Sequence, residues 1–528
     1  MRFNYITLTL FLLTLNLIAQ PADAVELSSG QLALIQSQGA EGIKTVLEES
    51  NISLENIDDV EAFVVKAVSA QISENRSVDN IEKITSSAMI AISEITISEG
   101  IKSSLVIEAV SSGVSKGIIE ASLNTNFNIS ETIEAASFTA AVTAVNLAVE
   151  KDIDVYEIIS AVSSGSTAGT ISGSYLGGIQ PTDPVEAASA GSAKGAIYAT
   201  SEATSINVAD SVEAASAGSA EGAVEASVEA NIDLAVSVEA VASGSTAGAI
   251  EASIEAGISV VNSAEAASAG STQGVVEAAL GFGANSLIII DITKIDVAKS
   301  IEAASAGSAQ GAVEASVEAN IDLADSVEAA ASGSAAGAIE ASVDANINVA
   351  DSVEAASAGS TQGVVEAASG NGANSRIIID TTDIDAAKAI EAASSGSAQG
   401  AVEASVEANI DLADSVEAAA SGSAAGAIEA SVDANINVAD SVEAASAGST
   451  QGVVEAASGN GANSRIIIDT NDIDIAKAVE AASSGSAQGA VEASIEANID
   501  IDDVDDDLPI IETPFDDDPS IRPVSPIK

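Results

Sequence analysis

The chain contains no cysteine, histidine or tryptophan in its 528 residues. Without cysteine it can form neither disulfides nor thiolate metal sites. Without histidine it lacks the side chain best suited to proton transfer near neutral pH, which is also the commonest transition-metal ligand. The composition therefore excludes Ser-His-Asp and Cys-His nucleophilic catalysis and His-based zinc chemistry.

Aromatic residues are scarce, at 2% of the chain, and none occurs between Phe282 and Phe515. Paired carboxylates support glycoside hydrolysis in other proteins. Enzymes of that class, however, need aromatic platforms and a shaped cleft for the sugar. We therefore expect no enzymatic activity and no cofactor.

Positive charge is also scarce, with 17 basic residues against 79 acidic ones and a formal net charge of −62. Phosphate binding needs positive charge, so a nucleic-acid partner is not expected, and anionic membrane surfaces should repel the chain. The simplest role of the negative charge is solubility and self-repulsion. The alternative is attraction of divalent cations or of a basic partner.

The first residues have the pattern of a secretory signal. Arg2 precedes an apolar stretch from Ile6 to Ile18, and Ala22-Asp23-Ala24 fits a small-x-small cleavage site. The pattern predicts a signal peptide over 1–24 and a secreted or periplasmic protein. The apolar stretch is shorter than the roughly 20 residues that span a bilayer. No later segment has that length of large apolar residues, so no membrane span is expected after cleavage. An uncleaved N-terminal anchor is the alternative.

Internal repetition dominates the rest of the chain. A motif of the form VEAASAGSAQGAVEASVEANIDLAD recurs with a step of 26 residues almost throughout. Two plain units and one extended unit form an 89-residue superrepeat, and its second and third copies differ at four positions. The three copies span 211–299, 300–388 and 389–477. Arrays can grow by such duplication because each added unit buries its face on the previous one.

The repeats divide the mature chain into three parts. An acidic C-terminal segment with five prolines is predicted to be disordered, because it has too little apolar surface to bury. A divergent N-terminal segment with larger aliphatic residues resembles the cap of an array. The predicted boundaries are 25–183 for the cap-like repeats, 184–499 for the regular array and 500–528 for the tail.

One unit, 325–351, predicts a helix of about 20 residues, roughly 30 Å long, followed by a short turn. Asp325 and Glu328 have capping-box spacing ahead of an Ala-rich run. Asn346 suits a left-handed C-terminal cap, with Ile347 packing back on the last turn. Such short turns place consecutive helices antiparallel. The predicted fold class is therefore all-α, a solenoid-like stack of ~26-residue helical units rich in Ala, Gly and Ser.

Two glycines in each unit complicate this prediction. Gly333 and Gly337 fall in the middle of the helix, where each costs about 1 kcal/mol relative to alanine. Either they let neighbouring helices approach closely and the helix is continuous or gently kinked, or the helix breaks there. We favour the continuous helix. Partial disorder in isolation is a third outcome, because large buried side chains are scarce.

The best candidate for a binding site is the extension in every third unit, where three isoleucines are followed by closely spaced aspartates. The candidate metal ligands are Asp380, Asp383, Asp385, Asp469, Asp472 and Asp474. Carboxylate and carbonyl oxygens are ligands for Ca²⁺. The spacing is not that of an EF-hand, however, and Lys294 replaces the middle aspartate in the first copy. The preferred interpretation is that these aspartates cap the next helix.

These observations predict an exported, non-enzymatic repeat protein that acts as a structural, matrix or surface-interaction scaffold. Its expected partners are a second copy of the chain or an extracellular protein. The main alternative is a low-affinity Ca²⁺-binding protein that the ion orders or assembles. A third is a peptide-binding solenoid module.

Overall fold

In the computed structural model, the described residues are 27–50, 52–75, 77–123, 128–201, 203, 206–281, 295–370, 384–434, 436–458 and 475–496. They form eighteen α-helices and no strand, which confirms the predicted fold class. The predicted signal peptide 1–24 and the tail 500–528 lie outside them.

The helices follow one another at short intervals along the chain. Their bounds are α2 Ser29–Gln38, α3 Ala40–Ser50, α4 Ile57–Glu74, α5 Val78–Glu99, α6 Ser103–Ser122, α7 Ile129–Lys151, α8 Val155–Gly177, α9 Thr182–Ser201, α10 Val208–Ala230, α11 Leu234–Ala256, α12 Val260–Ala279, α13 Val297–Ala319, α14 Leu323–Ala345, α15 Val349–Ser369, α16 Ala386–Ala408, α17 Leu412–Ala434, α18 Val438–Ser458 and α19 Ile475–Glu496.

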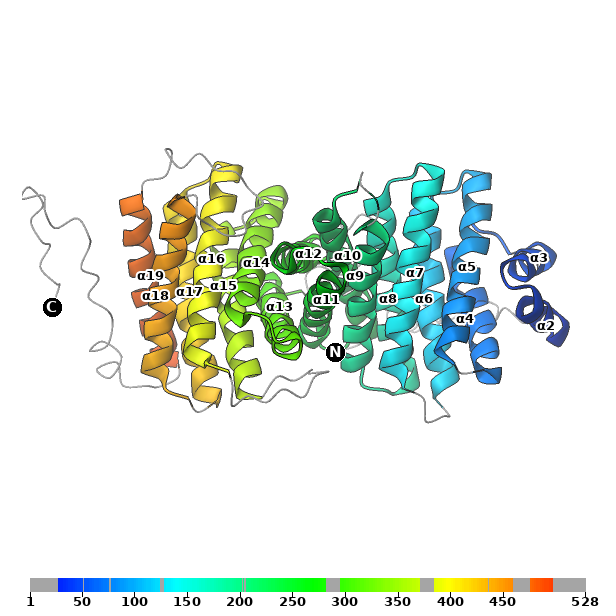
Figure 1. The fold of residues 1–528 in the computed structure, drawn as a ribbon, viewed down its shortest axis with the longest axis horizontal. Helices are drawn as coiled ribbons and strands as arrows, with labels where there is room; N and C mark the ends of the chain where they lie inside the picture. The colour runs from blue at the N-terminus through cyan, green and yellow to red at the C-terminus, as the bar shows by residue number, and fades with distance from the viewer. Residues whose placement is uncertain are drawn as a thin grey trace, which may run out of the picture.

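From α4 onward the helices form two layers, one of even-numbered and one of odd-numbered helices (Figure 1). Each helix packs most extensively on the helix two places along, and less on its immediate neighbour in sequence. Consecutive helices run in opposite directions, so the helices within a layer are parallel. In the view of Figure 1, α11 to α13 are seen nearly end-on while α4 to α8 and α15 to α19 stand upright. The array is therefore twisted along its length.

The start of α14 differs from the sequence prediction. In α14 the N-cap is Asp322, whose side chain accepts a hydrogen bond from the Ala324 amide at 3.0 Å. Asp325, the predicted cap, instead lies in the first turn, where a carboxylate interacts favourably with the helix dipole. The prediction was wrong by three residues because both aspartates precede good helix formers, and only the backbone shows which one is extended.

The end of the helix is as predicted. Asn346 adopts a left-handed conformation with φ 55°, and its amide donates to a carbonyl of the last turn. The Ile347 amide donates to the Ser342 carbonyl at 3.0 Å, and its side chain packs against a small apolar cluster. These contacts satisfy carbonyls that the helix leaves unpaired.

The mid-helix glycines do not break the helix, because α14 is continuous from Leu323 to Ala345. A Cβ placed on Gly337 would lie 2.5 Å from the carbonyl oxygen of Ala269 in α12. A Cβ on Gly333 would likewise collide with the backbone of Glu265. The glycines therefore let parallel helices of one layer approach backbone to backbone, which confirms the continuous-helix interpretation.

The core changes in character along the array. Near the N-terminus it contains large buried side chains such as Phe63, Met89 and Ile92. From α9 onward it consists mostly of Ala, Ser, Gly and Val. Small side chains bury little area each, so this part relies on close helix approach and many repeated contacts.

One helix in the described part of the chain, α7, is long and apolar enough to cross a membrane by length and composition. Its apolar residues include Ala136, Ala140, Ala144 and Val145, which are buried in the array. Its neighbours in the layer are α5 and α9.

Candidate functional site

Five of the six predicted metal ligands, Asp380, Asp383, Asp469, Asp472 and Asp474, lie outside the described residues. The sixth, Asp385, is the N-cap of α16, and its side chain accepts a hydrogen bond from the Lys388 amide at 3.2 Å. For this residue the helix-cap interpretation is correct. Among the described residues, no group of three or more acidic side chains is placed to hold a metal ion. A metal site in the extensions stays a prediction.

The structure instead draws attention to glutamates inside the array that the sequence analysis did not single out. Each regular unit carries a first glutamate, a middle residue between the two glycines, and a second glutamate. In α14 these are Glu328, Ala336 and Glu340. Several of these glutamates are almost completely buried, among them Glu108, Glu186, Glu265, Glu314 and Glu403.

Three successive helices of one layer bring these positions together, and α7, α9 and α11 show it most clearly. The middle residue of α9 is Lys194, whose Nζ lies 2.6 Å from Oε1 of Glu134, the first glutamate of α7. Lys194 also forms an ion pair with Glu251, the second glutamate of α11. Burial lowers the pKa of Lys194, but the two carboxylates outweigh this and leave it raised. We call this arrangement the three-helix cluster.

The same cluster without a lysine places two carboxyl groups near one another. Glu328 of α14 accepts a hydrogen bond from Ser395 of α16 at 3.5 Å and interacts with Glu455 of α18. Burial and then Glu455 raise the pKa of Glu328 to about 7. In the odd layer, burial and Glu366 raise the pKa of Glu239 to about 7.

Glu108 of α6 is more deeply buried than Glu239 and Glu328. Burial raises its pKa to about 8, although a hydrogen bond from Ser164 at 2.9 Å lowers it and Glu225 raises it further. Its Oε2 accepts no hydrogen bond from the described residues. A charged carboxylate is costly in such a place. These sites can therefore hold a proton at neutral pH, or a cation such as the Lys194 ammonium.

The sequence offers a weak signal for this cluster, namely a glutamate five residues before the first glycine of each pair except Gly165 and Gly169, where the residue is Ser160. On a single helix, that spacing does not tell whether the carboxyl group meets water or another helix. The Ala-rich surroundings leave no clear polar face to decide it. Only the packing of α14 against α16 shows that Glu328 is covered.

Comparisons with known proteins add little. No protein-family model matches the chain, and no curated protein matches it. One solved structure that it resembles is described as a "Circular tandem repeat protein with novel repeat topology and enhanced subunit contact surfaces". The two are 13% identical, the match covers 87% of this chain and 99% of that chain, and the TM-score is 0.22. At that score the likeness carries no argument. By its own architecture, the chain has a helical tandem-repeat fold.

Proposed function

We propose that the protein is an exported, non-enzymatic scaffold that presents many equivalent helical faces in a matrix or at a surface. The observation that carries the proposal is the glycine contact between helices two places apart. It recurs from α6 to α19 in every helix except α7, and in α14, α16 and α17 it joins a glycine to the backbone of a helix in the same layer. The repeated residues thus serve mainly to build the array.

The two layers present the same chemistry. The helices α14 and α17 have identical sequences, yet α14 lies in the even layer and α17 in the odd layer. Their buried positions also correspond one to one. A scaffold with equivalent faces on both sides can engage several copies of a partner at once, which raises overall avidity.

Composition supports the absence of catalysis, since the chain has neither histidine nor cysteine. Export is supported by the pattern of 1–24. N-terminal sequencing of the protein recovered outside the producing cells tests it, and a first residue of Val25 is the expected result. Recovery of the full-length chain inside the cells would contradict export.

The scaffold proposal is tested by deleting one superrepeat, 300–388, from the chain 25–528. This deletion removes α13 to α15 and moves α16 to the opposite layer, into a place that a near-identical helix occupied. We expect an unchanged helical signal per residue and a shorter particle, measured by circular dichroism and small-angle scattering. A matched control deletes 13 residues, 304–316, which removes Gly307 and Gly311 and leaves α13 with fewer than half of its residues, so that this helix can no longer pack along α11 and α15. Unfolding of the first variant, or equal tolerance of both, would contradict the proposal.

Circular dichroism of the chain 25–528 in chelator and then in millimolar Ca²⁺ separates the scaffold from the cation-ordered alternative. A scaffold held by helix packing is helical in chelator and does not change with Ca²⁺. A disordered spectrum that becomes helical only with Ca²⁺ would overturn the scaffold as stated.

A further inference from the structure

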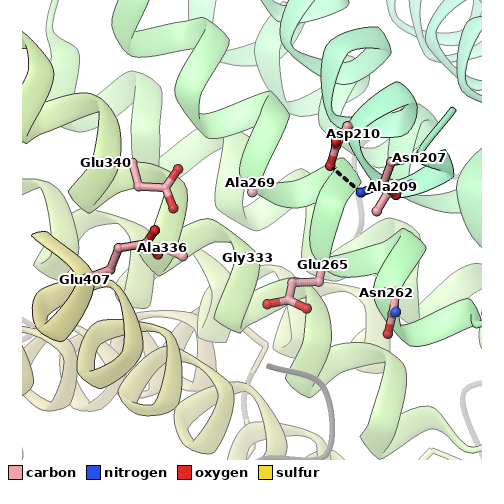
Figure 2. A pocket seen from close by; sticks show the side chains of 10 residues that line it. All are labelled: Asn207, Ala209, Asp210, Asn262, Glu265, Ala269, Gly333, Ala336, Glu340 and Glu407. Atoms are coloured by element: carbon pink, nitrogen blue, oxygen red, sulfur yellow. Dashed lines mark hydrogen bonds between the residues drawn. The ribbon is translucent and has the colours of Figure 1, made fainter. Parts of the chain in front are cut away.

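A pocket of about 490 Å³ opens on the even layer, across four successive helices of that layer, α10 to α16 (Figure 2). All of its lining residues come from these helices and the caps before them. They are Asn207, Ala209, Asp210, Asn262, Glu265, Ala269, Gly333, Ala336, Glu340 and Glu407.

The lining of the pocket is strongly acidic. Four of its ten residues are carboxylates, contributed by all four helices, and none is Lys or Arg. Glu265 is the buried one, with 4% of its surface exposed. Asn207 donates a hydrogen bond to Asp210 at 2.8 Å, so the right-hand end of the pocket in Figure 2 is polar as well. A cationic ligand complements this lining.

Two lysines elsewhere in the array show which kind of cation fits. Lys116 and Lys194 are both middle residues between two glycines, and each forms an ion pair with a carboxylate two helices earlier. The Lys116 Nζ lies 2.7 Å from Oε1 of Glu61, which has the place of a first glutamate. The space between the middle residue of one helix and the first glutamate two helices earlier therefore accommodates an alkylammonium group of the chain itself.

In α14 the middle residue is Ala336, and the first glutamate two helices earlier is Glu265. Both line the pocket. The pocket thus lies at the position that a lysine side chain occupies in α6 and α9. Ala336 is too small to fill this space, and the carboxylate of Glu265 still faces it.

We propose that this pocket binds a linear organic polyamine, with one ammonium group at Glu265 and the others at the remaining carboxylates. Because no three acidic residues in the described part of the chain are close enough to hold a metal ion, the carboxylates suit separated charges better than a single one. Charge-assisted N–H···O bonds supply the affinity. The proposal goes beyond the scaffold function, which does not depend on it.

The test is calorimetric titration of the chain 25–528 with spermidine at physiological ionic strength, where salt screens the non-specific attraction of the polycation to the net negative charge of the chain. We expect about one site per chain. The decisive variant is Ala336→Lys, which supplies the ammonium from the chain as Lys194 does, and should weaken binding by about tenfold or more. The control Ala425→Lys adds the same charge at the middle residue of α17, outside the pocket, and should change affinity less than about twofold.

A second pair of variants separates the pocket from the overall charge. Glu265→Gln and Glu318→Gln each remove one negative charge, but Glu318 is exposed on α13 and outside the pocket. Only Glu265→Gln should weaken spermidine binding. Equal affinities within either pair, or no saturable binding by the unaltered chain, would overturn the proposal. So would tighter binding of Ca²⁺ than of spermidine that Ala336→Lys abolishes.

Discussion

Gly337 of α14 packs directly on the backbone of Ala269 in α12, so closely that a Cβ on the glycine would lie 2.5 Å from the alanine carbonyl oxygen. Real Cβ atoms do not come this close to a backbone oxygen. Glycine costs helix stability in isolation, but here it permits the helix contact that the array repeats. The stabilising element of this protein is therefore a backbone contact rather than a large apolar side chain.

Gly337→Ala should destabilise the array even though alanine is the better helix former. The added methyl group forces α12 and α14 apart, and overpacking of this kind costs about 1–3 kcal/mol. Hydrogen exchange resolved by mass spectrometry should show faster exchange in both helices, since a long array opens locally. The matched control is Gly30→Ala in α2, where the nearest atom to a Cβ is 3.9 Å away. Its exchange should be unchanged or slower, and faster exchange in both variants would contradict the explanation.

Lys194→Met should destabilise the array. It removes the ammonium between Glu134 and Glu251, and breaking a partly buried pair leaves uncompensated charge, at a cost of about 3 kcal/mol or less. The thermal midpoint of unfolding measures the loss. Lys151→Met is the control, because Lys151 pairs only with the adjacent, exposed Glu150 in the ion pairs seen here. Equal losses in the two variants would argue against the cluster.

Stability should fall as pH rises from about 5 to 9. The pKa of Glu108 is about 8 in the folded chain against an ordinary 4.5, chiefly because of burial. The folded state thus holds a proton that the unfolded chain releases. The resulting stability is fully present below pH 4.5 and is lost as pH rises through the folded pKa. Each pKa unit corresponds to about 1.4 kcal/mol, so the thermal midpoint should drop by about 5 °C or more.

Glu108→Gln should flatten that pH dependence and raise the thermal midpoint at pH 9, because an amide carries no charge to bury. The exposed Glu318→Gln serves as the control and should keep the slope of the unaltered chain. A stability that rises with pH over this range would show that the buried carboxyl groups are charged in the folded state.

Asn346→Ala should destabilise the end of α14 by about 1–2 kcal/mol, because alanine tolerates the left-handed conformation poorly. Asn346→Gly should be nearly neutral, since glycine caps other helices here, as Gly257 does for α11. Local hydrogen exchange at the end of α14 measures the difference. Equal exchange in the two variants would mean that the cap conformation is not what limits opening there.

The sequence alone was sufficient for the fold class, the helix period and the left-handed asparagine caps, and it favoured continuous helices without excluding a break at the glycines. These features depend on local conformational preferences and on the spacing of residues within one unit, and both can be read from the sequence. The N-cap of α14 was predicted at Asp325 but lies at Asp322. Local preferences do not separate the two, because both aspartates precede good helix formers.

Tertiary structure alone decided two further features of the array. Identical sequences in α14 and α17 lie in opposite layers, because the layer is set by the alternating direction of successive helices and not by composition. Helices that are distant in sequence bring Glu328 close to Glu455. Such helices also form the pocket beside Ala336. A carboxyl group that is buried by a remote helix binds differently from an exposed one. The sequence of one repeat does not record which remote helix covers it.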